Sequence, residues 1–258
     1  MDLTEAAGLG ALSDDGFLSG RLRLWQPVAG YRAATDPVLL AAACPALTGQ
    51  SVLDLGCGAG AAGLCLAARV PGLALAGLEV QAGYAALARA NALRNGIAFE
   101  VHEGDIAAEP PALRRGFDHV IANPPYYAAG GTPAADGGRD LALREAMPLR
   151  LWTEAARRRL VPGGWLTLIL GADRLGAALA ALDGRMGSVA ILPLCPREGR
   201  AAVRVLIRAR KGGRAALRLL SPMVLHAGAT HAGDRDDNSP EAQAVLRESA
   251  AIRRFDQM

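Results

Sequence analysis

The stretch of sequence that decides the fold is VLDLGCGAG, residues 52–60. Its first four residues have the pattern of a buried β-strand, and Gly56, Gly58 and Gly60 allow a tight turn into the Ala- and Leu-rich segment 61–69, which is typical of a helix. A strand, a glycine turn and a helix in this order form a unit that can hold a nucleotide-like ligand. The glycine spacing alone indicates this only weakly, because glycines also serve ordinary turns.

Acidic residues at the ends of the next two predicted strands strengthen that interpretation. Glu79 closes the strand pattern of residues 73–80, where its carboxylate can accept hydrogen bonds from both hydroxyls of a ribose. Asp105 follows the strand pattern of residues 97–102 and could accept a hydrogen bond from an adenine amino group. Each has a plainer alternative, a solvated strand end for Glu79 and a turn aspartate for Asp105.

The tetrapeptide Asn-Pro-Pro-Tyr, residues 123–126, closes the apolar run of residues 117–122. An adenine amine or a glutamine amide is a poor nucleophile, because its nitrogen lone pair is delocalised into the attached π-system. If the Asn123 side-chain oxygen and the Pro124 carbonyl each accept one N–H, the nitrogen becomes more pyramidal and its lone pair can be aimed at a sulfonium methyl group. The prolines stiffen the turn, and Tyr126 can stack on a flat target. A purely structural turn is the alternative.

Taken in order, these segments resemble the class I S-adenosylmethionine-dependent methyltransferases. A nicotinamide dehydrogenase usually has GxGxxG, whereas the residue two places after Gly60 is Ala62. The resemblance implies that S-adenosylmethionine is the cofactor. It also implies the following cofactor-binding residues: Asp54, Gly56, Gly58, Gly60, Glu79, Asp105 and Asn123.

Two further segments extend the resemblance to the bacterial family that N6-methylates adenine 37 of valine tRNA. They are QPVAGYRAATDPVLL at residues 26–40 and RDLALR at residues 139–144. The resemblance covers the chain from about residue 22 to residue 210. The family often shows Gly-Thr-Asp-Gly where this chain has Ala-Thr-Asp-Pro at residues 34–37, and the portion after residue 211 matches poorly.

This family resemblance implies roles for further residues. Thr35 and Asp36 would contact the cofactor. Catalytic contacts would come from Asn123, Pro124 and Tyr126. The candidate substrate-binding residues are Pro125, Tyr127, Arg139 and Arg144, the two arginines as phosphate contacts. The expected partner is an RNA substrate, specifically tRNA.

Other classes of protein use the same tetrapeptide or the same fold, and these alternatives stay open. Protein-glutamine methyltransferases that act on release factors usually carry a separate helical domain before the glycine turn, and only a short segment precedes it here. RNA guanine-N2 methyltransferases commonly have a duplicated domain, for which this chain has no room. A non-catalytic cofactor-fold module that binds RNA or a partner is the third alternative, and the intact set of motifs argues against it.

Length and composition indicate one compact enzyme. A chain of 258 residues that is 51% hydrophobic can bury a sizeable core. No stretch reaches the roughly 18 to 20 apolar residues of a membrane span, and the first residues lack the features of a signal peptide, so we expect a cytoplasmic protein without membrane contact. The four cysteines have no metal-type spacing and are expected to be buried or turn thiols. No metal site is expected at His226 and His231.

Positive charge gathers in one region although the net charge is only +3. Residues 197–218 hold eight cationic side chains and one acid, so a polyanion could bind there. The alternative is that Arg204 and Arg208 are outward positions of an alternating strand. The Arg-Arg-Arg cluster at residues 157–159 fits a solvated helix end that complements the helix dipole.

The remaining pattern predicts an α/β fold. Strands are expected near residues 51–55, 74–79, 97–102, 117–122, 164–170, 188–194 and 201–209, and helices near residues 59–69, 82–95, 147–160 and 173–183. Their alternation predicts a Rossmann-like class I methyltransferase fold, with a mostly parallel seven-stranded sheet covered by helices on both faces. Ligands bind at the carboxyl edge of such sheets, where the motifs meet.

The pattern predicts three regions in the chain. Residues 1–45 are expected to be an N-terminal extension that packs near the cofactor site, residues 46–210 the methyltransferase core, and residues 211–258 a C-terminal extension. Within the core, the Gly-rich segment 127–140 is expected to act as a substrate lid or as a loop that orders on binding.

Overall fold

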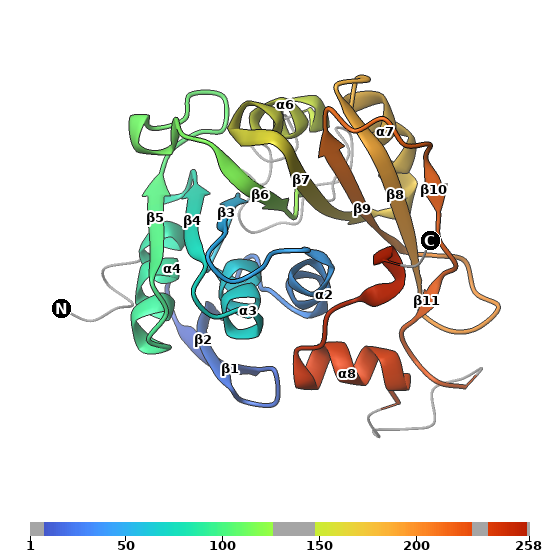
Figure 1. The fold of residues 1–258 in the computed structure, drawn as a ribbon. Coiled ribbons are helices and arrows are strands. Elements are labelled where there is room, and N and C mark those ends of the chain that lie inside the picture. The colour runs from blue at the N-terminus through green and yellow to red at the C-terminus, as the bar shows by residue number, and fades with distance from the viewer. Residues whose placement is uncertain (1–7, 126–147, 229–236, 257–258) are drawn as a thin grey trace.

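The computed structural model describes residues 8–125, 148–228 and 237–256, and Figure 1 labels its elements. The strands are β1 (Leu12–Phe17), β2 (Leu22–Pro27), β3 (Ser51–Leu55), β4 (Ala74–Glu79), β5 (Phe99–Glu103), β6 (Phe117–Ala122), β7 (Leu160–Gly171), β8 (Met186–Cys195), β9 (Arg204–Lys211), β10 (Arg218–Leu219) and β11 (Met223–Val224). The α-helices are α2 (Thr35–Ala43), α3 (Ala61–Arg69), α4 (Ala82–Arg94), α6 (Leu149–Arg159), α7 (Leu175–Ala181) and α8 (Pro240–Glu248). Short 3-10 helices are η1 (Pro111–Leu113), η2 (Ala172–Arg174) and η3 (Arg253–Asp256).

Most strands in the described residues belong to one sheet of nine strands, in the order β10-β8-β9-β7-β6-β3-β4-β5, with β11 paired to β8. Strands β5, β4, β3, β6 and β7 are parallel, and β9 runs antiparallel between β7 and β8. The predicted Rossmann-like, mostly parallel sheet is confirmed. The predicted number of seven strands is too low. Strands β10 and β11 are only two residues long, too short to give a strand pattern in the sequence.

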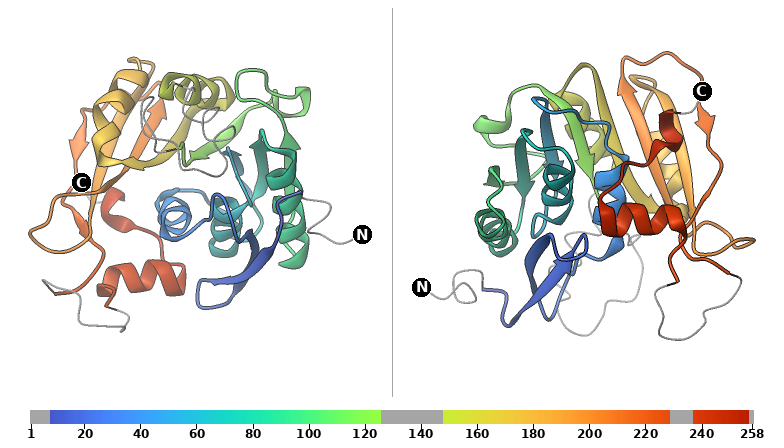
Figure 2. Two further views of the ribbon diagram at one scale, coloured as in Figure 1. Left: turned by 180° about the vertical axis from the view of Figure 1, so that it is seen from behind. Right: turned by 60° about the horizontal axis from the view of Figure 1, so that its bottom comes forward.

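Helices cover both faces of this sheet. Figure 1 and the reverse view in Figure 2 show α2, α3 and α4 on one face and α6 and α7 on the other. The central strands are therefore buried from both sides and carry continuous apolar runs: Val52, Leu53 and Leu55 of β3 and Val120 and Ile121 of β6 are all fully buried. Five parallel strands in this register bring the ends of β3, β4, β5 and β6 to one edge of the sheet.

The N-terminal region adds a hairpin that the sequence pattern did not predict. Strands β1 and β2 pair antiparallel from Leu12 to Pro27. Asn91 of α4 holds the hairpin, because its Oδ1 accepts the Trp25 N–H at 2.8 Å and its Nδ2 donates to the Trp25 carbonyl at 3.0 Å. The same Nδ2 donates to the carbonyl of Ala59 at 3.0 Å, so one buried side chain ties the hairpin to the glycine turn.

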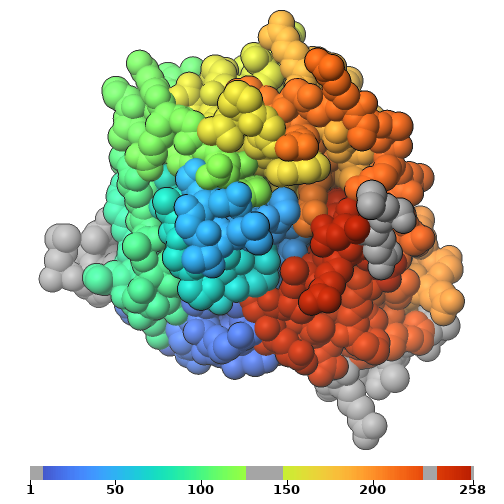
Figure 3. All heavy atoms as spheres, in the orientation of Figure 1, coloured from blue at the N-terminus to red at the C-terminus, as the bar shows by residue number. Residues whose placement is uncertain are grey.

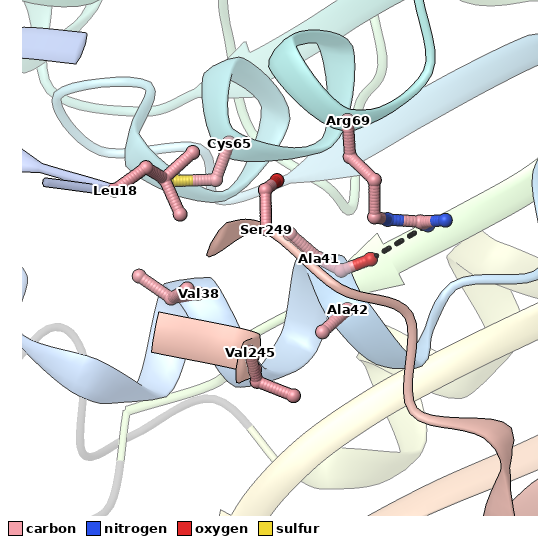
Figure 4. A pocket seen from close by; sticks show the side chains of 8 residues that line it. All are labelled: Leu18, Val38, Ala41, Ala42, Cys65, Arg69, Val245 and Ser249. Atoms are coloured by element: carbon pink, nitrogen blue, oxygen red, sulfur yellow. Dashed lines mark hydrogen bonds between the residues drawn. The ribbon is translucent and has the colours of Figure 1, made fainter. Parts of the chain in front are cut away.

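The C-terminal region packs on α2. The N–H of Ile252 donates to the Ala42 carbonyl at 2.9 Å, and Figure 3 shows the red C-terminal segment lying against the blue N-terminal part of the chain. Figure 4 shows the narrow pocket between α2, α3 and α8, which is lined by Val245 and Arg69, and the hydrogen bond that Arg69 donates to the Ala41 carbonyl. The domain boundaries at residues 45/46 and 210/211 stay predictions.

Candidate active site

The glycine turn after β3 has a backbone that requires glycine. Gly56, Gly58 and Gly60 have φ angles of 67°, 55° and 88°, in the left-handed region that glycine adopts without steric cost. A Cβ at Gly56 would lie 2.6 Å from Cη2 of Trp152, so the close approach of α6 also excludes a side chain there. The Gly56 N–H donates to the Leu78 carbonyl at 2.8 Å. The turn is thereby fixed at the carboxyl edge, between the ends of β3 and β4.

Glu79 lies beside this turn and is buried, with 6% of its surface exposed. Its Oε2 accepts the Gly58 N–H at 2.9 Å, and its Oε1 accepts the Gln81 N–H at 3.0 Å. Among the residues that the structure describes, no cation pairs with this carboxylate. The alternative of a solvated strand end is wrong, because the side chain is turned inward against the glycine turn. Its contact with a ribose stays a prediction.

Asp54 is a second buried carboxylate at the same edge, only 2% exposed. Its Oδ2 accepts the Gly63 N–H from the first turn of α3 at 3.0 Å. Burial raises the pKa of Asp54 from 3.8 to about 7; the Gly63 hydrogen bond opposes this shift and the nearby Glu79 adds to it. Asp54 therefore orients α3 relative to β3 and lies behind the glycine turn.

Asp105 follows β5 at the same edge. Its Oδ1 accepts the Ala107 N–H at 2.8 Å, and the preceding Gly104 N–H donates to the Glu79 carbonyl at 2.9 Å. These contacts make Asp105 a turn aspartate, as one of the two interpretations has it, and place it next to the end of β4. A contact between Asp105 and an adenine amino group stays a prediction.

Asn123, Pro124 and Pro125 follow β6 directly. Strand β6 pairs with β3 up to the partners Leu55 and Ala122, so Asn123 leaves the sheet next to the start of the glycine turn. Arg174 of η2 donates to the Pro125 carbonyl at 3.1 Å and fixes this part of the turn. The candidate acceptor site therefore lies beside the candidate cofactor site, as the sequence interpretation requires.

Tyr31 is the site residue that the sequence analysis did not single out. Its phenolic oxygen lies 3.2 Å from Asn123 Nδ2, and its carbonyl accepts the Tyr84 hydroxyl at 2.9 Å. A Cβ added at Gly58 would lie 3.8 Å from Cε1 of its ring, so Tyr31 also borders the glycine turn. The sequence held one indication of this role, because Tyr31 is the aromatic residue of the segment 26–40 that carries the family resemblance.

Thr35 and Asp36 begin α2. Asp36 Oδ2 accepts a hydrogen bond from Arg204 Nε of β9 at 3.1 Å, so this carboxylate forms an ion pair with the far half of the sheet. Their contacts with a cofactor stay predictions. Four predicted site residues and the predicted lid 127–140 lie outside the described residues; the four are Tyr126, Tyr127, Arg139 and Arg144.

Much of the basic region of residues 197–218 makes internal contacts. Arg208 is 7% exposed; its Nε donates to the Ala43 carbonyl and its guanidinium lies 4.2 Å from the ring centre of Phe255. Burial lowers the pKa of Arg208 to about 10. The interpretation of Arg208 as an outward position is wrong, because the C-terminal η3 covers this face of β9. Arg197 is likewise paired, with Asp237.

The arginine cluster at the end of α6 is not solvated as a whole, contrary to the sequence interpretation. Arg158 Nη2 and Arg159 Nε lie 3.1 and 3.0 Å from the carboxylate of Glu109, which is 6% exposed. Arg159 itself has 15% of its side chain exposed. The cluster is structural, as expected, but it acts through ion pairs with the buried carboxylate of Glu109.

A cationic hollow of about 440 Å³ lies at the opposite, amino edge of the sheet, where β7 and β8 begin and β9 ends. Arg157, Arg185 and Lys211 line it together with Pro162 and Gly212. The pKa of Lys211 is lowered by burial and by its cationic neighbours, foremost Arg157. This hollow is far from the carboxyl edge and does not belong to the candidate active site.

Cysteines and histidines in the described parts of the chain have structural surroundings. All four cysteines are buried and unpaired, as predicted, and burial raises the pKa of Cys65 to about 12. His226 Nδ1 lies 2.8 Å from Asp237 Oδ1, while His231 lies outside the described residues. The described ranges contain no group of three or more His, Cys, Asp or Glu side chains arranged for a metal ion. Nor does any helix within them have the length and apolar character needed to cross a membrane.

Two relatives of known name are similar to this chain in sequence. A tRNA1(Val) (adenine(37)-N6)-methyltransferase of Actinobacillus succinogenes is 29% identical over 196 residues, 75% of this chain and 82% of its own. A release factor glutamine methyltransferase of Geobacter sulfurreducens is 35% identical over 130 residues, but these are only 47% of this chain and 45% of that protein.

A solved structure and a family model extend the comparison. The crystal structure of an Agrobacterium tumefaciens protein described as a predicted O-methyltransferase is 30% identical, with a TM-score of 0.68 over 84% of this chain and 98% of that one. The model of the methyltransferase small domain matches residues 34–192, a span that includes the glycine turn, the buried carboxylates of Asp54 and Glu79, and Asn123. The chain therefore belongs to the methyltransferase small domain family, and it is a class I methyltransferase that uses S-adenosylmethionine.

Proposed function

We propose that this methyltransferase N6-methylates an adenine in tRNA. The observation that supports this most strongly is the position of Asn123. It follows β6, next to the end of β3 where the glycine turn begins, so an amine held by Asn123 would face a methyl donor held by the turn. Proximity and orientation of this kind supply a large part of the rate of a two-substrate reaction.

The residues at the carboxyl edge suit the cofactor. Each carboxylate oxygen of Glu79 accepts one backbone N–H and has a second lone pair, so the side chain can accept from two ribose hydroxyls without losing its anchors. Gly58 places no side chain above the turn, and Asp105 would accept from the adenine amino group. Thr35 and Asp36 would bind at the start of α2. When bound, the cofactor supplies an electrophilic methyl group on a positively charged sulfur.

The acceptor chemistry rests on Asn123 and Pro124. The Asn123 side-chain oxygen and the Pro124 carbonyl would accept the two N–H groups of the target amine, which localises its lone pair. The nitrogen gains the methyl group and loses one of its protons to water, so no strong general base is needed. Tyr126 would stack on the base, Pro125 and Tyr127 would line its site, and Arg139 and Arg144 would contact RNA phosphates.

Adenine in tRNA is favoured over other acceptors by the extent of the likeness. The Actinobacillus relative with that activity in its name matches most of both chains, 75% of this one and 82% of its own. An enzyme with this substrate would work in the cytoplasm, where tRNA is. Flipping the base out of a stacked loop costs a few kcal/mol, and remote phosphate contacts would offset that cost.

Methylation of a glutamine in a release factor is the second candidate. It uses the same hydrogen-bonding chemistry on an amide nitrogen, and the Geobacter relative with that activity in its name is 35% identical over the matched segment. RNA guanine-N2 methylation is a third candidate with the same chemistry.

One labelling experiment separates these candidates. The purified protein is incubated with radiolabelled methyl donor and either total RNA or total protein from a bacterial extract, and the labelled fraction is digested and identified. We expect label in RNA as N6-methyladenine, and none when Asn123→Ala replaces the wild type. Label in protein, on glutamine, would overturn the adenine proposal, and label in RNA guanine would redirect it to N2 methylation.

A further inference from the structure

Tyr31 connects the two halves of the site. It lies between β2 and α2, and 40% of its surface is exposed. At one end its hydroxyl lies 3.2 Å from Asn123 Nδ2. At the other end its carbonyl accepts the hydroxyl of Tyr84, a side chain on α4 that is 4% exposed.

The contact with Asn123 matters because an asparagine amide has two unlike ends. The oxygen accepts hydrogen bonds, whereas the nitrogen only donates them. The methyl acceptor brings N–H groups, so only the Asn123 oxygen can hold it; a flipped amide would set N–H against N–H. The two orientations have nearly the same shape, and a hydrogen-bond partner must therefore select one of them.

A phenolic hydroxyl can accept from Nδ2 or donate to Oδ1, and in this structure the Tyr31 hydroxyl makes the first of these contacts. It accepts a hydrogen bond from Nδ2, which directs Oδ1 away from Tyr31. The hydroxyl itself is held in place, because the main chain of Tyr31 is tied to Tyr84 and its ring borders Gly58 of the glycine turn. Tyr31 therefore contacts both the Asn123 amide and the glycine turn, so one side chain couples the orientation of the amide to the position of the turn.

We propose that Tyr31 is a positioning residue for methyl transfer, whose hydroxyl holds the Asn123 amide with its oxygen toward the acceptor nitrogen. This inference rests on the proposed amine methylation but does not depend on whether the amine belongs to adenine, guanine or glutamine. Tyr31 acts through Asn123 and needs no contact with the substrate.

A double-mutant cycle tests this, because residues that act through one another are not additive. Single-turnover rates are measured for the wild type, Tyr31→Phe, Asn123→Ala and the double variant, with the acceptor that the labelling experiment identifies. Tyr31→Phe should lower the rate about tenfold, the effect of about 1.4 kcal/mol from one lost hydrogen bond. In the Asn123→Ala background the same change should have no further effect.

Two more measurements separate positioning from a general structural role. Calorimetry should give the same cofactor affinity for Tyr31→Phe and wild type, and thermal unfolding should show an intact fold. Tyr84→Phe is the matched control: it removes the hydroxyl that anchors the Tyr31 carbonyl but keeps the Tyr31 hydroxyl itself, so its rate loss should be smaller than that of Tyr31→Phe.

The proposal is overturned if Tyr31→Phe keeps the wild-type rate, or if it lowers the rate by the same factor with and without Asn123. The second result would mean that the hydroxyl contacts substrate or cofactor independently. A result in which only protein becomes labelled would overturn the tRNA proposal and leave the cycle to be run on the protein acceptor, so the two failures are distinguishable.

Discussion

Two glutamates in this molecule are equally buried and held in opposite ways. Glu79 and Glu109 are each 6% exposed. Within the described parts of the chain, Glu79, at the carboxyl edge, accepts only backbone N–H groups, including that of Gly58. Glu109, under the end of α6, pairs with the guanidinium groups of Arg158 and Arg159.

The difference separates a region built for structure from one with capacity left for a ligand. A buried carboxylate that faces two arginines has its charge compensated within the chain. A buried carboxylate held by single N–H donors keeps unused lone pairs and an uncompensated charge, which costs folding free energy. Asp54, with its raised pKa, belongs to the second kind. The carboxyl edge is thus the part of the fold where stability is given up, as expected of a binding site.

The largest expected effect concerns Asp54. Its pKa is about 7 in the folded chain against 3.8 ordinarily, so between these pH values the native state keeps a proton that the unfolded chain has lost. Its contribution to stability is therefore fully present below its ordinary pKa of 3.8 and is lost as pH rises from there through the folded pKa of about 7. At 1.36 kcal/mol per pKa unit the total loss is about 4 kcal/mol. In urea unfolding, the stability of wild type relative to Asp54→Asn should fall by roughly 3 kcal/mol of that total between pH 5 and pH 8.

Asp118 supplies the control with the opposite sign. The N–H and hydroxyl of Ser51 donate to its carboxylate at 2.8 and 2.7 Å and lower its pKa. Its contribution to stability is present above its ordinary pKa and is lost as pH falls below about 4. Parallel pH profiles for wild type and Asp54→Asn would contradict the distinction between the two regions.

Glu109→Gln should destabilise the fold by about 3 kcal/mol, because it leaves Arg159 buried without its counter-ion. The value lies at the low end for a broken buried pair, since Arg158 is 38% exposed. The matched control is Glu100→Gln, whose carboxylate is 43% exposed and pairs with Arg115; it should cost less than about 1 kcal/mol. Denaturant unfolding measures both. Cofactor affinity of the folded variants should stay at the wild-type value, and a weakened affinity in Glu109→Gln would break the comparison.

Glu79→Ala should have the opposite result. Loss of its hydrogen bonds to the ribose should weaken cofactor binding by about 1.5–3 kcal/mol, roughly tenfold to a hundredfold. Calorimetry measures this, and denaturant unfolding should show no loss comparable to that of Glu109→Gln. Wild-type affinity in a folded Glu79→Ala protein would contradict its assignment to the cofactor.

The smallest effect is expected from the arginines assigned to RNA phosphates. Each phosphate contact releases roughly one counter-ion, so Arg139→Ala/Arg144→Ala should lower the salt slope of tRNA binding by about 2 and leave cofactor affinity unchanged. Arg185→Ala/Lys211→Ala removes two charges at the opposite edge of the sheet and serves as the control. Equal slopes in wild type and the Arg139/Arg144 variant would assign those arginines to a solvated surface and favour a protein substrate.

The core of the fold could be read from the sequence because its signals are local. The strand at residues 51–55 and its glycine turn fall where the pattern predicts, since parallel strands covered on both faces need continuous apolar runs and Gly56 needs a positive φ. The end of β4 at Glu79 and the end of β6 before Asn123 follow from the same pattern.

The contacts that complete the site could not be read in this way, because they join distant parts of the chain. The strand pattern predicts Arg208 as an outward position, but η3 covers it in the fold. The helix end predicts that Arg158 and Arg159 are solvated, but both pair with Glu109 from a distant part of the chain. Tyr31 is 92 residues from Asn123 in sequence, and only the packing of the N-terminal segment on α4 brings them together. Spacing within one segment carries no information about such pairs.

The most direct test of the account is single-turnover methylation by Asn123→Ala, with cofactor affinity measured on the same preparation. Asn123 is assigned to the acceptor amine, through hydrogen bonds that strengthen in the transition state. The account therefore predicts a rate at least about a hundredfold below wild type, with cofactor affinity nearly unchanged. A near-normal rate would show that Asn-Pro-Pro is a structural turn in this protein, and would contradict the assignment of this edge of the sheet to amine methylation.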